Sequence, residues 1–387
     1  MNANAAAAVW LALVVPSLYI VHKYGGTGGA AAYAALAAGA VAAAPHLPVS
    51  RSRRVRLAVA VVTIAVVVIV FAVVYPVVNV HAPALGSDDD DAYNAGARAL
   101  IGGRSPYSET TYLGNVLHQL PGAFVLAAPF VIAGTSALQN LFWLPAFLLA
   151  VRKETDDAAA LRLSWLILAM SPTVVHQVVT GTGHAANTIY VALGLWWLTR
   201  TRHTNIAGAL WGVALASRAN FLLLLPLAFG WVWQHRGPRS AVATMALACS
   251  TVAALVVPFY LNDPAHFGPL EAANRLLRFD AVFPHAGIAI GTLMAGAAIV
   301  LSCIRMDRAT LFTRCAVVQA LPVIAGVLLS GWGRQALAYA TYGTFAAWFV
   351  FMAAADQFAD TGSSPARIRG EPRIASDQGV AAGRVRT

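Results

Sequence analysis

Long apolar runs, separated by short clusters of arginine, occupy most of this sequence. The runs lie at 7–22, 28–45, 55–79, 119–134, 137–151, 160–176, 185–199, 205–218, 220–234, 240–260, 286–304, 310–330 and 334–354. Only 11% of the residues are charged and 59% are hydrophobic, whereas a soluble domain carries about 25% charged residues. Because a helix of about 20 apolar residues crosses a bilayer, the sequence predicts an all-α, polytopic transmembrane bundle. We expect about eleven to thirteen helices, some of them short or kinked.

The arginine clusters predict how the chain is oriented. They lie between the runs, at 51–56, 152–153, 200–202, 236–239 and 305–314. Positive residues beside membrane helices mark the cytoplasmic side, so we expect the polar segments 80–118 and 261–285 outside. This placement also argues against nucleic-acid binding as the reason for the net charge of +10. We expect a multi-pass protein of the plasma membrane, in contact with membrane lipids and not with nucleic acid.

One stretch does not fit simple alternation. Two apolar runs, 119–134 and 137–151, separate the external segment from Arg152, where an odd number of crossings is required. Either the run 119–134 is re-entrant, or the loop from Arg152 to Asp157 is external. The sequence leaves both topologies open.

The chain divides into three parts by composition. Residues 1–50 predict two additional transmembrane helices, and residues 51–356 predict the main membrane domain with its external loops 80–118 and 261–285. Residues 357–387 are polar and rich in Gly, Ser and Arg, which predicts a disordered cytoplasmic tail.

Four consecutive aspartates, Asp88 to Asp91, open the first polar segment after a long apolar run. Neighbouring carboxylates repel one another, so at least one of them should hold its proton more tightly than usual. A short amphipathic helix is expected from Tyr93 to Ile101, ending at Gly102 and Gly103. By itself, such a run is also typical of a solvated acidic loop.

The residues after this run resemble a known external loop. From Asp89 the order is Asp-x-x-x-Tyr93, then Ala95-Gly96-Ala97, Gly103, Ser105-Pro106-Tyr107, and Leu120-Pro121 running to Ala128-Pro129. This order is similar to the first external loop of GT-C glycosyltransferases, which use polyprenyl-phosphate-linked sugars. It looks most like glycosyltransferase family 87, the α-1,2-mannosyltransferase-like branch.

Two later stretches fit the same resemblance, which covers roughly residues 80–235. Gly183-His184-Ala185-Ala186-Asn187 resembles the family's Gly-Gln-x-x-Asn turn, and the small-residue run 207–214 before Arg218 resembles its helix ending in a basic residue. The chain departs from the family in having four acidic residues in place of one dominant one, His184 in place of Gln, and Arg218-Ala219-Asn220 in place of Lys followed by Pro.

The resemblance implies an inverting transfer of mannose, or of a related hexose or pentose, from a polyprenyl-phosphate donor to an external glycan or lipid acceptor. It also implies that one aspartate of the run is the general base. Spacing to Tyr93 favours Asp89 and then Asp88, with Asp91 and Asp90 as the remaining candidates. A carboxylate can take the proton of the attacking hydroxyl, while an arginine can hold the departing phosphate. Arg218, between two apolar runs, suits the second role because a charge inside a membrane segment is costly to keep.

Other polar residues of the external side are candidates for binding the sugar or the phosphate. They are His184, Asn187, Tyr93, Tyr107, Arg104, His118, Gln119, Arg275 and Arg278. We expect no cofactor and no metal ligand, and a divalent cation bound to the aspartate run is the less favoured alternative.

Two other functions remain in competition with an enzyme. A transporter or a flippase for lipid-linked sugars should carry inverted repeats and polar residues near the middle of the membrane. In this chain the polar residues gather in the two external segments, and no repeat is evident. A third reading is a non-catalytic assembly subunit, against which the intact acidic loop argues.

Overall fold

The computed structural model describes residues 1–81, 87–271, 277–331 and 333–359. Within these ranges the regular secondary structure is helical, and the only paired extended backbone is one isolated β-bridge between Thr110 and Val116. The expected all-α architecture is therefore confirmed. The expected disordered tail lies almost wholly outside the described residues.

The chain begins with a helical hairpin. Helix α1 (Ala3–Ala43) turns back at Gly26, whose φ of 62° lies in the left-handed region that glycine adopts without strain. Trp10 Nε1 donates to the Ala34 carbonyl at 2.8 Å, and the Tyr33 hydroxyl donates to the Leu13 carbonyl at 3.0 Å. The two arms of α1 therefore lie side by side.

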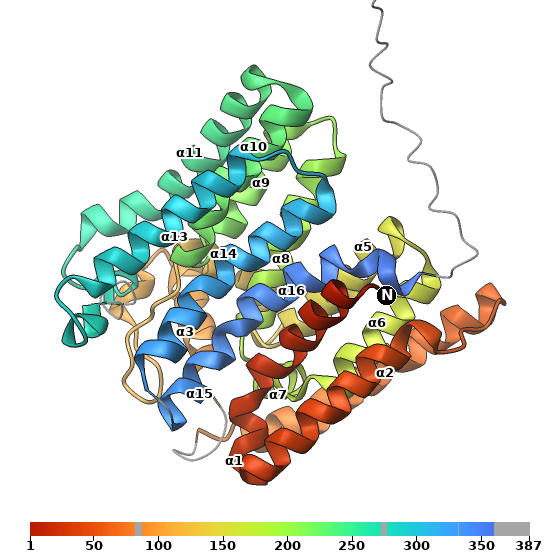
Figure 1. The fold of residues 1–387 in the computed structure, drawn as a ribbon. Helices are drawn as coiled ribbons and strands as arrows, with labels where there is room; N and C mark the ends of the chain where they lie inside the picture. The colour runs from red at the N-terminus through yellow and green to blue at the C-terminus, as the bar shows by residue number, and fades with distance from the viewer. Residues whose placement is uncertain (82–86, 272–276, 332, 360–387) are drawn as a thin grey trace, which may run out of the picture.

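Helices of unequal length follow this hairpin (Figure 1). They are α2 (Arg53–Val78), α3 (Asp89–Ile101), α4 (Pro121–Ile132), α5 (Leu138–Glu154), α6 (Asp157–Met170), α7 (Pro172–Thr180), α8 (His184–Arg200), α9 (Thr204–Leu215), α10 (Leu225–Arg236), α11 (Pro238–Asn262), α13 (Ala286–Cys303), α14 (Arg308–Leu329), α15 (Arg334–Ala340) and α16 (Thr344–Ala353). Short 3₁₀ turns are η1 (Ala44–His46), η2 (Pro106–Ser108), η3 (Ala219–Leu224), η4 (Arg278–Ala281), η5 (Thr341–Gly343) and η6 (Ala355–Phe358).

Six helical segments of the described chain are long and apolar enough to cross a membrane, or seven if α6 and α7, bent by 81°, form one span. Fewer segments meet this test than the eleven to thirteen helices that the sequence predicts, and the two arms of α1 count within a single segment. The difference arises because α5 and α8 have only 17 residues each and α9 only 12. Short helices of this kind pack in the centre of the bundle, while α2 is almost entirely exposed on its outside.

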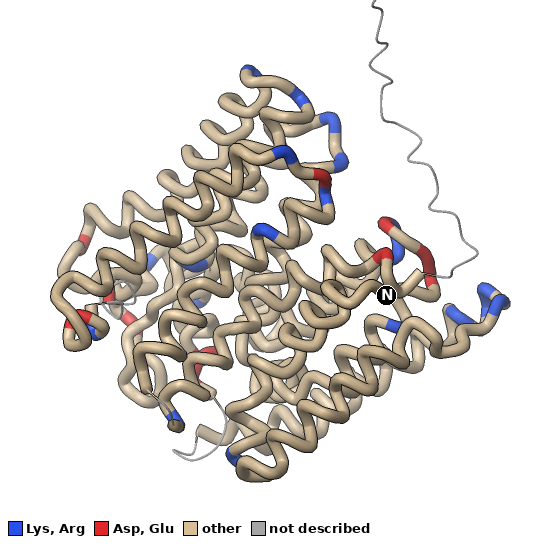
Figure 2. Tube along the Cα trace, in the orientation of Figure 1, with Lys and Arg blue, Asp and Glu red and all other residues tan. Residues whose placement is uncertain are grey.

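The arginine-rich loops gather at one end of the bundle, here called the arginine end. Glu154 accepts from Arg200 Nη1 at 2.6 Å and from Arg308 Nη1 at 2.8 Å. Arg56 pairs with Asp157 at 3.0 Å. Figure 2 shows a band of Lys and Arg along the upper and right-hand rim. The arginine clusters therefore lie at the same end of the bundle, as their placement between the apolar runs predicts. These clusters are 51–56, 152–153, 200–202 and 305–314.

The opposite end, here called the aspartate end, carries α3. Helix α2 begins near Arg56 at the arginine end and reaches Asp90 through Tyr75, whose hydroxyl donates to Asp90 Oδ2 at 2.7 Å. Its 26 residues correspond to about 39 Å of helix. The two ends are therefore separated by roughly the thickness of a bilayer with its headgroup regions.

Helix α4 resolves the ambiguous stretch between α3 and α5. At its start, the Gly122 N–H donates to the Ala216 carbonyl at 2.7 Å, and the ring of Phe124 packs against Tyr93 of α3. Just beyond its end, the Ser136 N–H donates to Asn94 Oδ1 of α3 at 2.8 Å. Both ends of α4 therefore lie beside α3, and α5 alone makes the passage to Glu154 at the arginine end.

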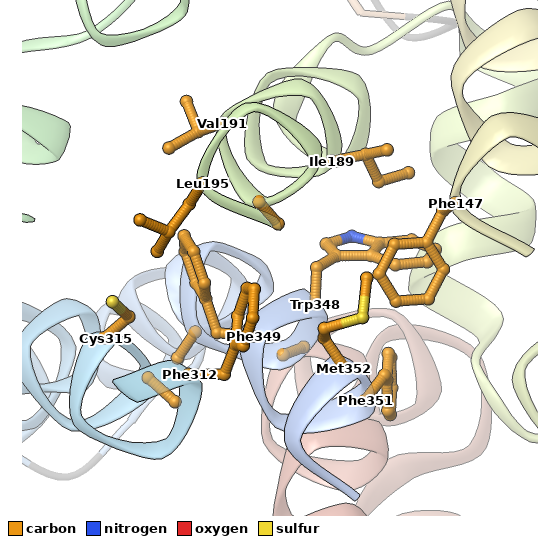
Figure 3. Packing of buried hydrophobic residues seen from close by; sticks show 14 of the residues in the cluster. Phe147, Ile189, Val191, Leu195, Phe312, Cys315, Trp348, Phe349, Phe351 and Met352 are labelled. Atoms are coloured by element: carbon orange, nitrogen blue, oxygen red, sulfur yellow. The ribbon is translucent and has the colours of Figure 1, made fainter. Parts of the chain in front are cut away.

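Small residues and aromatic rings make the core between the helices. Helix α9 packs closely on α11 because Gly208 and Gly212 face the Thr244 and Ala248 carbonyls, where a Cβ would come within 2.6 Å. Figure 3 shows the largest cluster, in which Trp348 and Phe349 of α16 pack among side chains of α5, α8 and α14. Cys315 lies in this cluster and is buried, whereas Cys249 and Cys303 are exposed.

The placement of α4 leads to a topological prediction. In a chain with Cys249, Cys303 and Cys315 replaced, Ser108→Cys and Ala133→Cys should react with a membrane-impermeant maleimide from the same side of sealed vesicles. Lys153→Cys should react only from the other side, because α5 separates it from Ala133. Labelling of Ala133→Cys and Lys153→Cys from one side would contradict the placement.

Candidate active site

The aspartate run forms the start of helix α3, four residues earlier than the amphipathic pattern predicts. Asp88 is the N-cap residue, and Asp89, Asp90 and Asp91 occupy the first turn. Acidic side chains are favoured at this position because the helix dipole is positive there. Successive residues of a helix point about 100° apart, so the four carboxylates face four different surroundings.

Two of the four carboxylates hold neighbouring loops in place. Asp88 Oδ2 accepts from Thr111 Oγ1 at 2.8 Å and from Asn115 Nδ2 at 2.7 Å. Asp91 Oδ1 lies 3.1 Å from His81 Nε2. Within the described residues neither carboxylate hydrogen-bonds to Arg218, and Asp91 Oδ2 is buried without a hydrogen-bond partner.

Asp90 is buried against the end of α2. Its Oδ2 accepts from the Tyr75 hydroxyl at 2.7 Å and from Asn79 Nδ2 at 2.8 Å, while Oδ1 has no hydrogen-bond partner among the described residues. Burial raises the pKa of Asp90 to about 6, although the Tyr75 hydrogen bond opposes the shift; the charges of Asp91 and Asp89 add to it. The expectation that one member of the run holds its proton unusually tightly therefore falls on Asp90.

Asp89 is the one aspartate of the run that contacts an arginine among the described residues. Arg218 Nη2 lies 3.3 Å from Asp89 Oδ1, and the two side chains keep 16% and 15% of their surfaces exposed. Gln119 Nε2 donates to Oδ1 at 3.0 Å, and the Gly183 N–H donates to Oδ2 at 2.7 Å. The carboxylate is thus held by three donors from three separate segments of the chain.

The environment keeps Asp89 ionised. Burial raises its pKa, but the charge of Arg218 and the hydrogen bonds from Gly183 and Gln119 bring the pKa below its ordinary value. His184 adds no charge near neutral pH, because burial lowers the pKa of its ring to about 4. Asp89 and Asp90, adjacent in sequence, therefore differ in charge near pH 5. The difference arises because a guanidinium faces one of them and neutral donors face the other.

The turn that carries the Gly183 N–H depends on glycine. Helix α7 ends at Gly181, in the left-handed conformation with φ 72°. Two residues later, a Cβ on Gly183 would lie 2.5 Å from the ring of Tyr93. Tyr93 is fully buried, so the ring has no room to retreat.

Arg218 is held by more than Asp89. Its Nη2 donates to the Tyr93 hydroxyl at 3.2 Å, and its guanidinium lies 5.4 Å from the centre of the Phe345 ring. With its amide oxygen turned toward the guanidinium, Asn187 accepts from Arg218 Nε at 2.8 Å and from the Tyr93 hydroxyl at 2.6 Å. The arginine therefore has a fixed orientation that does not rely on the carboxylate.

His184 completes the group at the first turn of α8. Its ring centre lies 5.2 Å from that of Phe345 and 5.6 Å from that of Tyr342. Its Nδ1 is buried without a hydrogen-bond partner among the described residues. The structure therefore brings six sequence candidates into one site: Asp89, Tyr93, Gln119, His184, Asn187 and Arg218.

The other sequence candidates that the structure describes make their contacts with residues other than Asp89 and Arg218. The Tyr107 hydroxyl donates to the Gln119 carbonyl at 2.9 Å, and its ring packs against Phe124 and Phe267. His118 Nδ1 lies 3.2 Å from the Gly268 carbonyl oxygen, and Arg104 forms an ion pair with Glu109.

The remaining two arginine candidates come from the second polar segment. Arg278 is exposed on η4, and Arg275 lies outside the described residues. Sequence reasoning missed Phe345 and Tyr342, because an aromatic residue inside an apolar run carries no signal of its role.

No set of three or more His, Cys, Asp or Glu side chains in the described ranges is grouped as metal ligands would be. No protein-family model, no curated protein and no solved structure matches this chain. The function therefore has to be argued from the site itself.

The protonation of Asp90 makes a prediction for stability. The folded-state pKa of about 6 exceeds the ordinary value of 3.8, so the folded protein loses stability as pH rises through 6 and the buried carboxyl ionises. A shift of this size corresponds to at most roughly 3 kcal/mol. Asp90→Asn should therefore raise the unfolding temperature in detergent more at pH 8 than at pH 5. An equal effect at both pH values would contradict a neutral Asp90.

The close approach at Gly183 makes a second prediction. Gly183→Ala should destabilise the protein by about 1–3 kcal/mol, because the added methyl group overlaps the buried Tyr93 ring. Gly296→Ala is the matched control, since a Cβ there meets nothing within 4 Å and alanine favours a helix. Thermal unfolding of the purified variants measures both. Similar unfolding temperatures for the two variants would argue against the packing described here.

Proposed function

We propose that this protein is a membrane glycosyltransferase that uses a polyprenyl-phosphate-linked sugar. The observation that carries the proposal is the contact between Asp89 and Arg218 at the aspartate end of the bundle, 3.3 Å apart and partly exposed. A carboxylate and a guanidinium side by side provide what a sugar phosphate requires, a proton acceptor and an anion holder. The donor would be a hexose or pentose, mannose being favoured, and the acceptor an external glycan or lipid.

In the proposed reaction, the acceptor hydroxyl attacks the anomeric carbon from the side opposite the phosphate. Its proton passes to an oxygen of Asp89 as the new carbon–oxygen bond forms. The bond between the anomeric carbon and the phosphate oxygen breaks, and the bonding pair leaves with the phosphate. Arg218 stabilises the negative charge on the departing lipid phosphate. The configuration at the anomeric carbon is inverted.

The position of the site within the bundle supports a lipid-linked substrate. Asp89 lies at the end of the helices, where a lipid phosphate would meet water while its hydrocarbon chain stays in the bilayer. An apolar groove of about 470 Å³ lies between α2 and the bent pair α6–α7, lined by Val66, Val70, Trp165, Val175 and Val179 among others. Its Val179 end is four residues from Gly183, which contacts Asp89.

The arrangement of charge also bears on orientation. The Arg-rich loops gather at the end opposite Asp89, and positive loops mark the cytoplasmic side of a membrane protein. We therefore propose that the protein lies in the plasma membrane with its site on the external face. The acceptor would then be met outside the cell.

The test is transfer of labelled sugar from polyprenyl-phosphate donors by the purified protein. Asp89→Asn should lower the rate at least about 100-fold, because general-base catalysis contributes about 10²–10⁴. Arg218→Gln should do the same, and Arg218→Lys should recover only part, since lysine lacks the planar fork. Asp88→Asn and Asp91→Asn are matched controls within the same run and should stay within about threefold of wild type.

Two results would overturn the proposal. One is full activity in Asp89→Asn, which would remove the base. The other is movement of the lipid-linked sugar across vesicles without release of lipid phosphate, which would instead identify a flippase.

A further inference from the structure

The resting site holds Asp89 in a state that is unsuited to accept a proton. Oδ1 accepts from Gln119 at 3.0 Å and faces Arg218 at 3.3 Å, and Oδ2 accepts from Gly183 at 2.7 Å. A carboxylate with this many donors, one of them charged, has its proton affinity lowered. The general base of the proposed reaction therefore has to be released before it can act.

Arg218 has hydrogen-bonding capacity to spare. Its Nη2 serves both Asp89 and Tyr93, and its Nε faces the Asn187 oxygen. Within the described residues, Nη1 has no hydrogen-bond partner, although the side chain is only 16% exposed. Arginine carries five N–H donors in a planar fork. The Nη1 group can therefore donate hydrogen bonds to an incoming anion while Nε remains bonded to Asn187.

Among the hydrogen-bonding contacts that hold the two groups, the one between Asp89 and Arg218 is the longest, and the contact of Arg218 with the Tyr93 hydroxyl is next at 3.2 Å. At 3.3 Å the Asp89–Arg218 contact exceeds the 2.7–2.9 Å typical of a charge-assisted hydrogen bond. The anchors on either side are shorter: 2.7 Å from Gly183 to Asp89 and 2.8 Å from Arg218 to Asn187. A second anion at Arg218 would therefore meet its competitor in Asp89, the carboxylate that the guanidinium contacts in the described residues.

We propose that the phosphate of the donor competes with Asp89 for Arg218, so that donor binding itself releases the base. The inference rests on the proposed function and goes beyond it by naming how the two groups are coupled. Tyr93 and Asn187 act as positioning residues, because they keep the guanidinium in place when its partner changes. Once the phosphate is bound, Asp89 has lost its counter-charge and has an anion as neighbour, and both changes raise its affinity for a proton.

The competition predicts that removing the charge of Asp89 increases the affinity of the protein for a lipid phosphate. The full-length protein, purified in detergent, is titrated with farnesyl phosphate at pH 7.5 by calorimetry. Asp89→Asn should bind farnesyl phosphate about tenfold more tightly than wild type, because the variant removes the competing anion. Arg218→Gln should bind it at least about tenfold more weakly. Asp88→Asn removes the same charge one residue away and should bind within about twofold of wild type.

A second variant and a second readout keep the test decisive. Asp89→Ala should show the same tightening if Asp89→Asn does not fold, as judged by gel filtration and thermal unfolding. Asn187→Ala should weaken binding in the wild-type background and also in the Asp89→Asn background, because it loosens the guanidinium itself. A merely structural role for Asn187 would lower the unfolding temperature and leave the affinity of the folded fraction unchanged.

The outcomes separate this inference from the function on which it rests. Equal or weaker binding in both Asp89 variants, together with normal sugar transfer by wild type, overturns the competition and leaves the transferase standing. Absence of farnesyl phosphate binding in wild type and in every variant, together with no transfer from any polyprenyl-phosphate sugar, overturns the proposed function itself. Tighter binding in an Asp89 variant that no longer transfers sugar supports both.

Discussion

The lack of water inside a bilayer is the constraint on which this structure depends. Backbone N–H and C=O groups there must be bonded within the chain, so the described residues form helices and almost nothing else. Charged side chains are then confined to the two ends of the bundle, where they can reach water or one another. At the arginine end, guanidinium groups pair with Glu154 and Asp157. At the aspartate end, Asp89 and Arg218 form a partly buried ion pair, in which the charge of each group offsets part of the cost of burying the other.

Helix geometry turns a repetitive sequence into distinct chemistry. The four aspartates are identical as residues, yet the rotation of α3 gives each one a different neighbour. Asp88 and Asp91 secure loops, Asp90 is buried beside Tyr75 with its pKa raised to about 6, and Asp89 stays charged opposite Arg218. The run is thus neither a simple acidic loop nor four equivalent candidates. One carboxylate is directed inward at the site, and its neighbours fix the helix that directs it.

The sequence predicts the fold class well because apolar length has one physical meaning in a membrane chain. It does not settle α4, because the run 119–134 is as apolar as a crossing helix. Only the contacts of Phe124 and Ser136 with α3 show that both ends of α4 lie on one side.

Part of the site could be predicted from the sequence because several of its residues stand in recognisable local motifs. Asp89, Arg218, His184 and Asn187 stand in local motifs, whereas the direction of Tyr107 or His118 is decided by tertiary packing. Phe345 lies in an ordinary apolar run, and nothing local marks the ring that packs against the guanidinium.

The first hairpin, whose composition alone suggests an appendage, is built into the support of the site. Gly343 of η5 approaches Pro16, and Val9 and Leu13 share the main core cluster with Phe345 and other residues of α16. A single guanidinium, Arg162, donates both to the Leu47 carbonyl after the hairpin and to the Phe358 carbonyl after α16. A shortened chain that starts at α2 would expose the face of α16 that packs on α1 and remove the packing behind Phe345, so the folded unit that holds the site includes the first helix.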